Sequence, residues 1–234
     1  MIFPFMFDWT FALLIPAMIL AFWAQAKVST NMAKFSKVNT QRGITGAQVA
    51  ANILDSHGIR DVQIGRMDAP HGDHYDPSKK VIMLSAHVYD SSSITAVSVA
   101  AHEVGHAVQH NESYAPLAFR TGFFPIVRFS SMLAFPLILI GFLFTNLGNL
   151  SFLFIQLGII FFAATVVFHL ITLPVEFNAS SRAMDLLEDS RILTADELGG
   201  AKKVLSAAAM TYVAAATMAI SQLLRLLLIA GRRS

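Results

Sequence analysis

Long apolar runs constrain this sequence more than any other feature. A helix that crosses a bilayer needs about 20 mostly apolar residues. Three runs meet that length, at about residues 3–26, 122–147 and 150–173, and the connection between the last two is short enough to make them a helical hairpin. A fourth run, at about 207–230, is a weaker candidate because it is rich in alanine and interrupted by an arginine. The sequence therefore predicts an integral membrane protein with three to four transmembrane helices.

The composition excludes several other classes of protein. Hydrophobic residues make up 55% of the 234 residues and charged residues 14%, against roughly 25% charged in soluble domains. The absence of cysteine excludes a disulfide-stapled secreted domain, and a net charge of +2 without a dense basic patch disfavours a nucleic-acid partner. No Lys or Arg precedes the first apolar run, so it is predicted to be a retained anchor and not a signal peptide.

The distribution of positive charge predicts an orientation in the membrane. Of the 17 Lys and Arg residues, 14 lie in residues 27–128 and 182–203. By the positive-inside rule these regions face the cytoplasm and the N-terminus lies outside. A complete fourth span would place three arginines outside, against the rule: Arg225, Arg232 and Arg233. Either that helix re-enters the membrane or packs beside the site, or the rule is overruled there.

The polarity pattern divides the chain into five segments. They are an N-terminal transmembrane anchor (1–26), a cytoplasmic part (27–121), a transmembrane hairpin (122–173), a helical segment (174–206) and a membrane-associated C-terminal helix (207–234).

The cytoplasmic part is predicted to mix helices and strands. Capping residues and periodicity give helices at about 47–57 and 94–110, strands at 61–67 and 80–85, and a loop at 69–78. A further helix is expected at about 175–188, after the hairpin. Thr194 and Glu197 then form a capping box for the helix that leads into the fourth run.

The motif with the clearest chemistry is His102-Glu103-Val104-Gly105-His106. On a helix, side chains four apart project from one face, so His102 and His106 can reach one zinc ion. Zinc lowers the pKa of water to about 7, and the adjacent Glu103 is placed to take its proton as a general base. The alternative is two ordinary histidines on an apolar helix. Gly105 costs up to ~1 kcal/mol relative to Ala inside a helix, so a close contact is expected there.

A catalytic zinc usually has three protein ligands, and the third must come from elsewhere. His110 lies four residues after His106, but one straight helix cannot surround an ion with three ligands. Glu176 begins the helix after the hairpin, and the hairpin returns the chain to the side that it left. An interfacial glutamate near a helix N-terminus is the alternative, and the residues alone leave both open.

Several stretches together resemble the YugP-like family of bacterial membrane zinc metallopeptidases and, more distantly, the HtpX and CAAX-prenyl membrane proteases. They are the HEVGH motif, Asp73-His74-Tyr75-Asp76-Pro77, Tyr114-Ala115-Pro116, Leu173-Pro174-Val175-Glu176-Phe177 with Asn178-Ala179-Ser180, and Thr211-Tyr212-Val213-Ala214-Ala215. The two spans between the His helix and the Glu helix are part of the resemblance.

The resemblance implies a mainly α membrane protein whose residues 27–121 form a small α+β zincin-like domain carrying the HExxH helix. It implies Zn2+ held by His102, His106 and Glu176, as in gluzincins, with Glu103 as the base. The distant relatives commonly have Asp where Ser180 stands. A serine hydroxyl can still hydrogen-bond to a ligand and hold its geometry.

Other residues are weaker candidates for the site. Three compete for stabilising the oxyanion of the reaction, and the sequence does not choose among them: Tyr75, Arg182 and Tyr212. Three more could form a second metal site or line the cleft, although a polar turn is the favoured interpretation: His71, His74 and Asp76. The strand at 80–85 is either a plain core strand or one to which a substrate adds as a further strand.

The predicted function is a membrane-embedded zinc endopeptidase that cuts membrane or membrane-proximal polypeptides at the cytoplasmic face of a bacterial plasma membrane. Its expected partners are such a polypeptide and the lipid bilayer, with no nucleic acid. The main alternative is a non-catalytic metal-binding or scaffold protein of the membrane. A small-ion transporter is disfavoured because intramembrane charges are few and no inverted repeat is visible.

Overall fold

The computed structural model describes residues 8–69, 72–144, 146 and 148–232. The chain divides into two compact units. The first unit comprises Met1–Trp23, Phe119–Leu173 and Tyr212–Ser234, and the second comprises Ala24–Ala118 and Pro174–Thr211.

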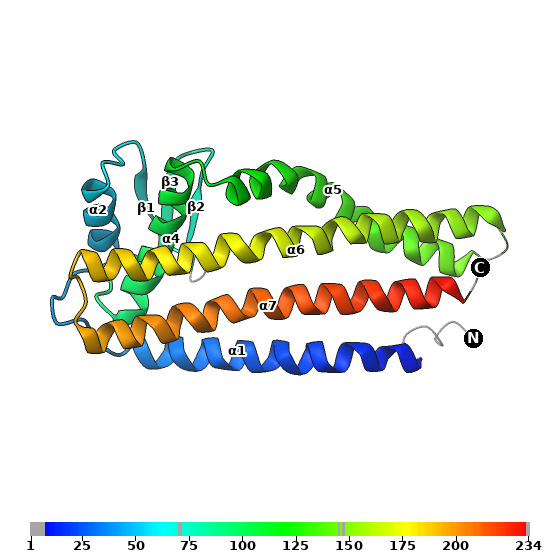
Figure 1. Ribbon diagram of the computed structural model, residues 1–234, viewed down its shortest axis with the longest axis horizontal. Coiled ribbons are helices and arrows are strands. Elements are labelled where there is room, and N and C mark those ends of the chain that lie inside the picture. The colour runs from blue at the N-terminus through cyan, green and yellow to red at the C-terminus, as the bar shows by residue number, and fades with distance from the viewer. Residues whose placement is uncertain (1–7, 70–71, 145, 147, 233–234) are drawn as a thin grey trace. The chain divides into compact units, whose positions relative to one another are not determined.

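Long helices account for most of the first unit (Figure 1). A short 3-10 helix (Trp9–Leu14) leads into α1 (Ile15–Phe35), and the other long helices are α5 (Ala115–Leu143), α6 (Asn149–Asp189) and α7 (Ala195–Gly231). In the described part of the chain, four helical stretches are long and apolar enough to cross a membrane, and α7 is among them. The prediction of a mainly helical chain is thus confirmed, and several of its helices have the length and apolar composition that crossing a membrane requires.

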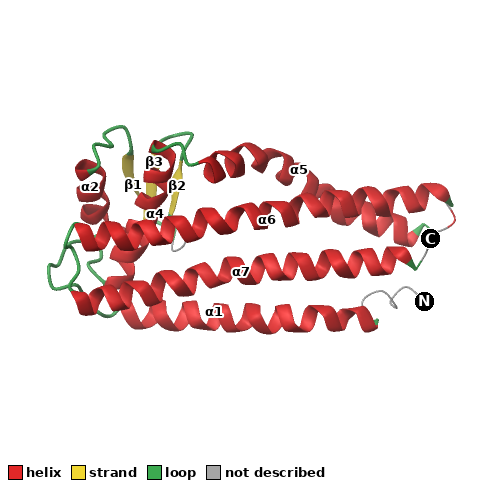
Figure 2. Ribbon diagram, viewed as in Figure 1, coloured by secondary structure: helices red, strands yellow, loops and turns green. Residues whose placement is uncertain are grey.

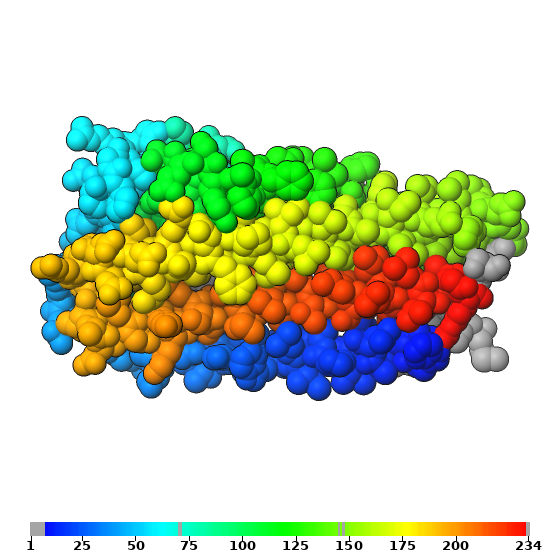
Figure 3. Space-filling model, viewed as in Figure 1, coloured from blue at the N-terminus to red at the C-terminus, as the bar shows by residue number. Residues whose placement is uncertain are grey.

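The helices of this unit pack through apolar and charged contacts. Ile138 of α5, Ile155 of α6 and Leu226 of α7 belong to one buried cluster. Arg232 lies 3.2 Å from the carboxylate of Asp8, and the guanidinium of Arg225 lies over the Phe11 ring. These contacts link the two ends of the described chain. The first part of α1, the end of α7 and the start of α6 accordingly form adjacent bands of side chains (Figure 3).

The second unit contains the sheet and the shorter helices (Figure 2). Its elements are α2 (Gly46–Ser56), β1 (Gln63–Met67), β2 (His74–Asp76), β3 (Val81–Ser85), α3 (Ala86–Tyr89) and α4 (Ile94–Asn111). The strand order is β1-β3-β2, with β1 parallel and β2 antiparallel to β3. Ile82 of β3 pairs with Ile64 on one side and Tyr75 on the other.

The capping signals in the sequence act as predicted. The Thr45 hydroxyl accepts from the backbone of Gln48, whose side chain accepts from the backbone of Thr45. Ser93 caps α4 through the Ala96 N–H. Thr194 and Glu197 make the reciprocal bonds of a capping box at the start of α7. These caps satisfy backbone donors that helix N-termini leave open.

Three details of the sequence prediction are wrong. The expected loop at 69–78 contains β2. The strand predicted at 80–85, observed as β3, is the centre of the sheet with a partner on each side, so no substrate can add to it. The helix expected at 175–188 is not separate, because α6 continues from Asn149 through Pro174 to Asp189.

The core of the second unit fixes α4 from several sides. Buried residues of α2, β3, α4 and α6 form one apolar cluster, which includes Ile53, Leu84, Val97, Val104 and Leu187. Side chains of this kind contribute roughly 1.5–3 kcal/mol each when fully buried. The helix that carries the HEVGH motif is therefore a central and rigidly packed element.

Candidate metal centre

The HEVGH motif lies in the middle of α4, where its side chains are largely withdrawn from solvent. Glu103 and His106 are buried, at 7% and 8% exposed, and His102 is partly buried. Within the described part of the chain, the Glu103 carboxylate makes no hydrogen bond or ion pair. No hydrogen bond within that part of the chain therefore fixes this carboxylate.

Gly105 is a point of close contact between α4 and α6. A Cβ at this position would lie 2.6 Å from the backbone oxygen of Ala179, closer than such atoms approach in proteins. The close contact expected from a glycine inside this helix is thus confirmed. Gly105 lies between His102 and His106, and Ala179 lies one turn after Glu176, so the contact brings the ligand candidates of both helices within reach of one another.

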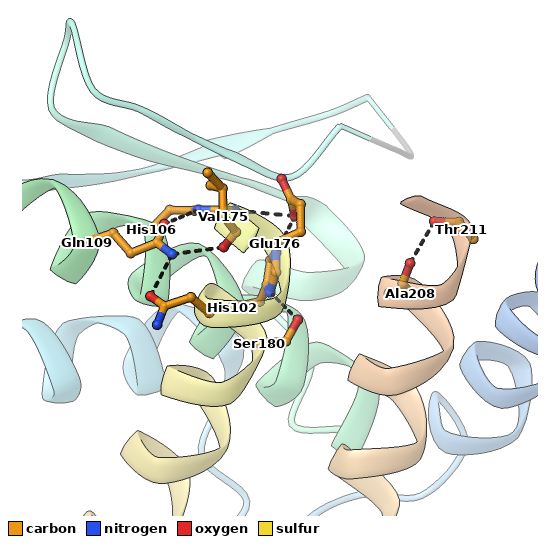
Figure 4. Close-up of polar contacts among 9 residues, drawn as sticks. His102, His106, Gln109, Val175, Glu176, Ser180, Ala208 and Thr211 are labelled. Atoms are coloured by element: carbon orange, nitrogen blue, oxygen red, sulfur yellow. Dashed lines mark hydrogen bonds and ion pairs between the residues drawn. The ribbon is translucent and has the colours of Figure 1, made fainter. Parts of the chain in front are cut away.

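Glu176 meets both histidines. Its Oε2 lies 3.3 Å from His102 Nε2 and 3.7 Å from His106 Nε2. The three ligand atoms all lie within 4.8 Å of one another, and Glu176 is 2% exposed. The arrangement is seen in Figure 4, where the three side chains converge from two helices.

This arrangement fits zinc. In a tetrahedral site with bonds of about 2.0–2.2 Å, neighbouring ligand atoms lie about 3.3–3.6 Å apart. The two nitrogen–oxygen distances fall at or near that range. Two imidazoles and one carboxylate are also a common donor set of catalytic zinc, with one position left for water or substrate.

Each histidine is held by a hydrogen bond at its other ring nitrogen (Figure 4). Ser180 Oγ lies 3.3 Å from His102 Nδ1, and Gln109 Oε1 lies 3.0 Å from His106 Nδ1. Both rings therefore turn Nε2 toward Glu176. Such partners orient metal-binding histidines and fix which nitrogen carries the proton.

Gln109 and Asn178 are two residues of this site that sequence reasoning missed. Gln109 is fully buried, and its Nε2 donates to the Val175 carbonyl at 2.8 Å and to Asn178 Oδ1 at 2.9 Å. The signal in the sequence was weak: Gln109 follows His106 by three residues, but it stands at the start of the polar run that continues with His110. Its partners on α6 could not be identified without the fold.

The electrostatics of His106 reflect its surroundings. Burial acts to lower the pKa of His106, but the carboxylates of Glu176 and Glu103 and the bond to Gln109 together hold its pKa above the ordinary value. The site thus attracts positive charge, whether it is a proton or a cation.

The oxyanion candidates differ in their surroundings. Arg182 donates through Nε to Asn178 Oδ1 at 2.8 Å and lies 2.6 Å from Glu112 Oε2. The Tyr75 hydroxyl lies 2.7 Å from His110 Nδ1. Burial, with smaller contributions from Asp61 and Asp76, raises the pKa of Tyr75 to about 12. Tyr212 is the first residue of a segment of the other unit, and its role stays a prediction.

The suggested second metal site does not assemble among the described residues. His102, His106 and Glu176 are the one group there whose ligand atoms could share an ion. His74 Nδ1 instead bonds the Gly72 carbonyl, and Asp76 accepts from the backbone N–H groups of the following turn. His71 lies outside the described residues.

Comparison with known proteins agrees with this chemistry. Residues 10–231 match the family described as "Putative neutral zinc metallopeptidase". The chain is 50% identical over 217 residues to the Bacillus subtilis (strain 168) protein named "Putative membrane protease YugP", a match that covers 93% of this chain and 94% of that protein. No solved structure matches the chain. The resemblance to YugP-like proteins is confirmed, and zinc is the metal of this family. The chain, which has helices long and apolar enough to cross a membrane, belongs to this family of neutral zinc metallopeptidases.

Proposed function

We propose that the chain is a membrane zinc endopeptidase of the gluzincin type. In it His102, His106 and Glu176 hold the zinc and Glu103 is the general base. The observation that carries the proposal is the convergence of three ligand atoms from α4 and α6 within 4.8 Å of one another. Glu103, adjacent to one ligand and free of other hydrogen bonds within the described chain, distinguishes an enzyme from a site that only stores metal.

The zinc, when bound, supplies a Lewis acid and lowers the pKa of water to about 7. The Glu103 carboxylate takes a proton from the attacking water and delivers it to the amide nitrogen that leaves. Because Glu103 is buried at 7% exposed, little bulk water competes for that proton. Peptide-bond hydrolysis is the reaction that this combination serves.

The remaining candidates divide into positioning and binding roles. Ser180 holds the His102 ring through the bond to Nδ1. Arg182 is engaged by Glu112 and Asn178, which favours a positioning role over direct contact with the substrate. Tyr75 and Tyr212 remain the candidates for stabilising the carbonyl oxygen of the substrate.

The proposed substrates are polypeptides of the membrane or close to its surface. Glu176 follows Leu173, the last residue of an apolar segment, by three positions, which favours a site close to the membrane boundary. In the described structure β2 pairs with β3 alone, so its other edge offers a template for an extended substrate. The excess of positive charge in residues 27–128 and 182–203 supports the proposal that this site faces the cytoplasm at a bacterial plasma membrane.

The test uses the full chain, purified in detergent and then placed in liposomes. Glu103→Gln should abolish cleavage of fluorescent casein and of a single-span reporter peptide, while zinc content stays at the wild-type level. Glu188→Gln, which changes an exposed carboxylate of α6, is the matched control and should cleave normally.

Glu176→Gln gives the second arm, because it should lose most of its zinc along with its activity. Cleavage by Glu103→Gln at the wild-type rate would contradict the role of the base. Full zinc in Glu176→Gln would contradict the ligand set. A wild type that holds zinc but cleaves neither substrate would favour the scaffold function.

A further inference from the structure

Gln109 is the residue through which both halves of the metal site are connected. It is 0% exposed, and all of its polar contacts lie inside the protein. Its Oε1 faces His106 Nδ1 at 3.0 Å, and its Nε2 faces two oxygens of α6, from Val175 and Asn178, at 2.8 and 2.9 Å. One side chain thus contacts a metal-ligand candidate on α4 and the segment of α6 that bears Glu176.

The direction of each hydrogen bond in this chain of contacts can be assigned. The Arg182 guanidinium has only donors, so the Asn178 atom that faces it must be the amide oxygen. That oxygen can only accept from Gln109, and so can the Val175 carbonyl. The Gln109 nitrogen therefore faces α6 and its oxygen faces His106.

The consequence reaches the metal-binding atom. Because Gln109 presents an acceptor, His106 Nδ1 must carry a hydrogen, and in the neutral ring Nε2 then keeps its lone pair. Nε2 is the atom that lies 3.7 Å from Glu176 Oε2. Glu112 anchors the far end of the series through its 2.6 Å contact with Arg182. A run of five side chains, from Glu112 to His106, thus determines which nitrogen can bind metal.

We propose that Gln109 is a positioning residue with two linked tasks: it fixes the tautomer and orientation of His106, and it holds the Glu176 segment of α6 against α4. This inference rests on the proposed zinc site. If Gln109 only filled the core, substitutions there would lower the affinity for zinc in step with the loss of folding stability. If Gln109 positions the ligands, a substitution that breaks its hydrogen bond to His106 lowers the affinity for zinc by more than the loss of stability explains.

Two substitutions separate the tasks. Gln109→Met keeps the length of the side chain but removes both the bond to His106 and the bonds to α6. Gln109→Glu keeps an acceptor toward His106 Nδ1, but its second oxygen faces the oxygens of Val175 and Asn178. Ser98→Ala is the matched control, because Ser98 is another fully buried polar residue of α4 and bonds only its own helix, at Ile94.

The measurements are made on the full chain in detergent. The zinc dissociation constant is obtained by competition with a chromophoric chelator, the visible spectrum is recorded after Co2+ substitution, and thermal unfolding is followed without metal. Loss of a partner behind a metal-binding histidine typically costs 10–100-fold in affinity. Gln109→Met should therefore bind zinc 10–100-fold more weakly, with altered Co2+ absorption bands, and Ser98→Ala should match the wild type in both.

The comparison of the two Gln109 variants decides between positioning and plain packing. Gln109→Glu should be at least as unstable without metal as Gln109→Met, yet should bind zinc more tightly than Gln109→Met. Zinc affinities that simply follow the thermal stabilities of the two variants would overturn the proposal. So would a Gln109→Met protein with the wild-type dissociation constant and Co2+ spectrum.

Failure of the underlying site is distinguishable from failure of this inference. A wild type that binds no zinc, or a Glu176→Gln variant that binds it normally, would overturn the proposed ligand set and the role of Gln109 with it. A normal wild type combined with an unaffected Gln109→Met would overturn the role of Gln109 alone. If Gln109→Met does not fold, Asn178→Ala replaces it and should weaken zinc binding by removing one of the two α6 contacts of Gln109.

Discussion

At the scale of single residues, Gly105 shows how local helix preference and site geometry oppose each other. Replacing a helical glycine with alanine ordinarily stabilises a helix by up to ~1 kcal/mol. At Gly105 the new methyl group would lie 2.6 Å from the Ala179 backbone oxygen, which has no flexible end that could move away. The two helices would have to separate, and with them the ligands that they carry.

Gly105→Ala should therefore lower both the unfolding temperature and the affinity for zinc, despite its better helix propensity. The matched control is Gly199→Ala in α7, where nothing lies within 4 Å of the added methyl group. That variant should be as stable as the wild type or slightly more so. Thermal unfolding and chelator competition on the three proteins check both statements, and an equally stable Gly105→Ala protein would contradict this account of the helix contact.

The role of a site residue could be predicted from the sequence where it depends on neighbours along the helix. It could not be predicted where it depends on a partner far away in the sequence. The spacing of His102 and His106 depends only on the helical period, and the meaning of Gly105 only on its cost in a helix. Glu176 needed the resemblance to a family as well, since the residues alone left two interpretations open. Gln109 acquires its meaning from the Val175 carbonyl 66 positions away, which no local pattern in the sequence encodes.

At the scale of elements, the short strand β2 is joined to α4 by the bond between Tyr75 and His110. The pKa of Tyr75 is raised from 10.0 to about 12, first by burial and then by the nearby Asp61 and Asp76. The folded protein thus holds the phenolic proton more tightly than the unfolded chain. This contribution to stability is fully present below pH 10 and is lost as the pH rises through about 12.

Tyr75→Phe removes this titration along with the bond to His110. The variant should be less stable than the wild type at neutral pH by about 0.5–1.5 kcal/mol, the usual worth of a hydrogen bond. Between pH 10 and 12 the wild type should lose stability more steeply than the variant, so the two curves converge. Denaturant unfolding at a series of pH values checks this, and parallel curves over that interval would show that Tyr75 does not titrate as described.

Helix α6 shows where element-level prediction reaches its limit. A proline inside a helix removes one backbone bond and crowds the preceding turn, which disfavours a continuous helix through Pro174. The helix continues because the residues beyond the proline are held by tertiary packing, with Val175, Ala179 and Ala183 all 0% exposed. Strand β2 was not predicted for a related reason. Its three residues are too few to show an alternation of polar and apolar side chains, and only the pairing with β3 defines it as a strand.

For the molecule as a whole, two arguments about the fourth apolar run disagree. Its length favours a complete membrane span, whereas the positions of its arginines disfavour one. Helix α7 is long and apolar enough to cross a membrane, yet in the predicted orientation a complete span would put its arginines on the side that the positive-inside rule disfavours. Two of these arginines have partners in the first unit. Arg232 pairs with Asp8 and lies over the Trp9 ring, and Arg225 lies over the Phe11 ring. These contacts offset part of the free-energy cost of placing the two arginine charges there.

The absence of cysteine from the chain allows a direct test of the proposed topology. Asn149 begins α6, and Glu176 lies 27 positions further along the same continuous helix, about 40 Å at 1.5 Å per residue, enough to cross a bilayer. Lys79, in the exposed turn after β2, belongs to the same unit as Glu176. Asn149→Cys and Lys79→Cys should therefore lie on opposite faces of the membrane.

With the positively charged regions in the cytoplasm, a membrane-impermeant maleimide should label Asn149→Cys in intact cells and Lys79→Cys only after lysis. The unsubstituted protein, which has no thiol, measures background labelling. Zinc content near the wild-type level in each variant shows that the substitutions leave the metal site intact. Labelling of Lys79→Cys alone in intact cells would reverse the orientation and place the peptidase site outside. Equal labelling of both would mean that α6 does not carry the chain across the bilayer, and the charge argument would then lose its basis.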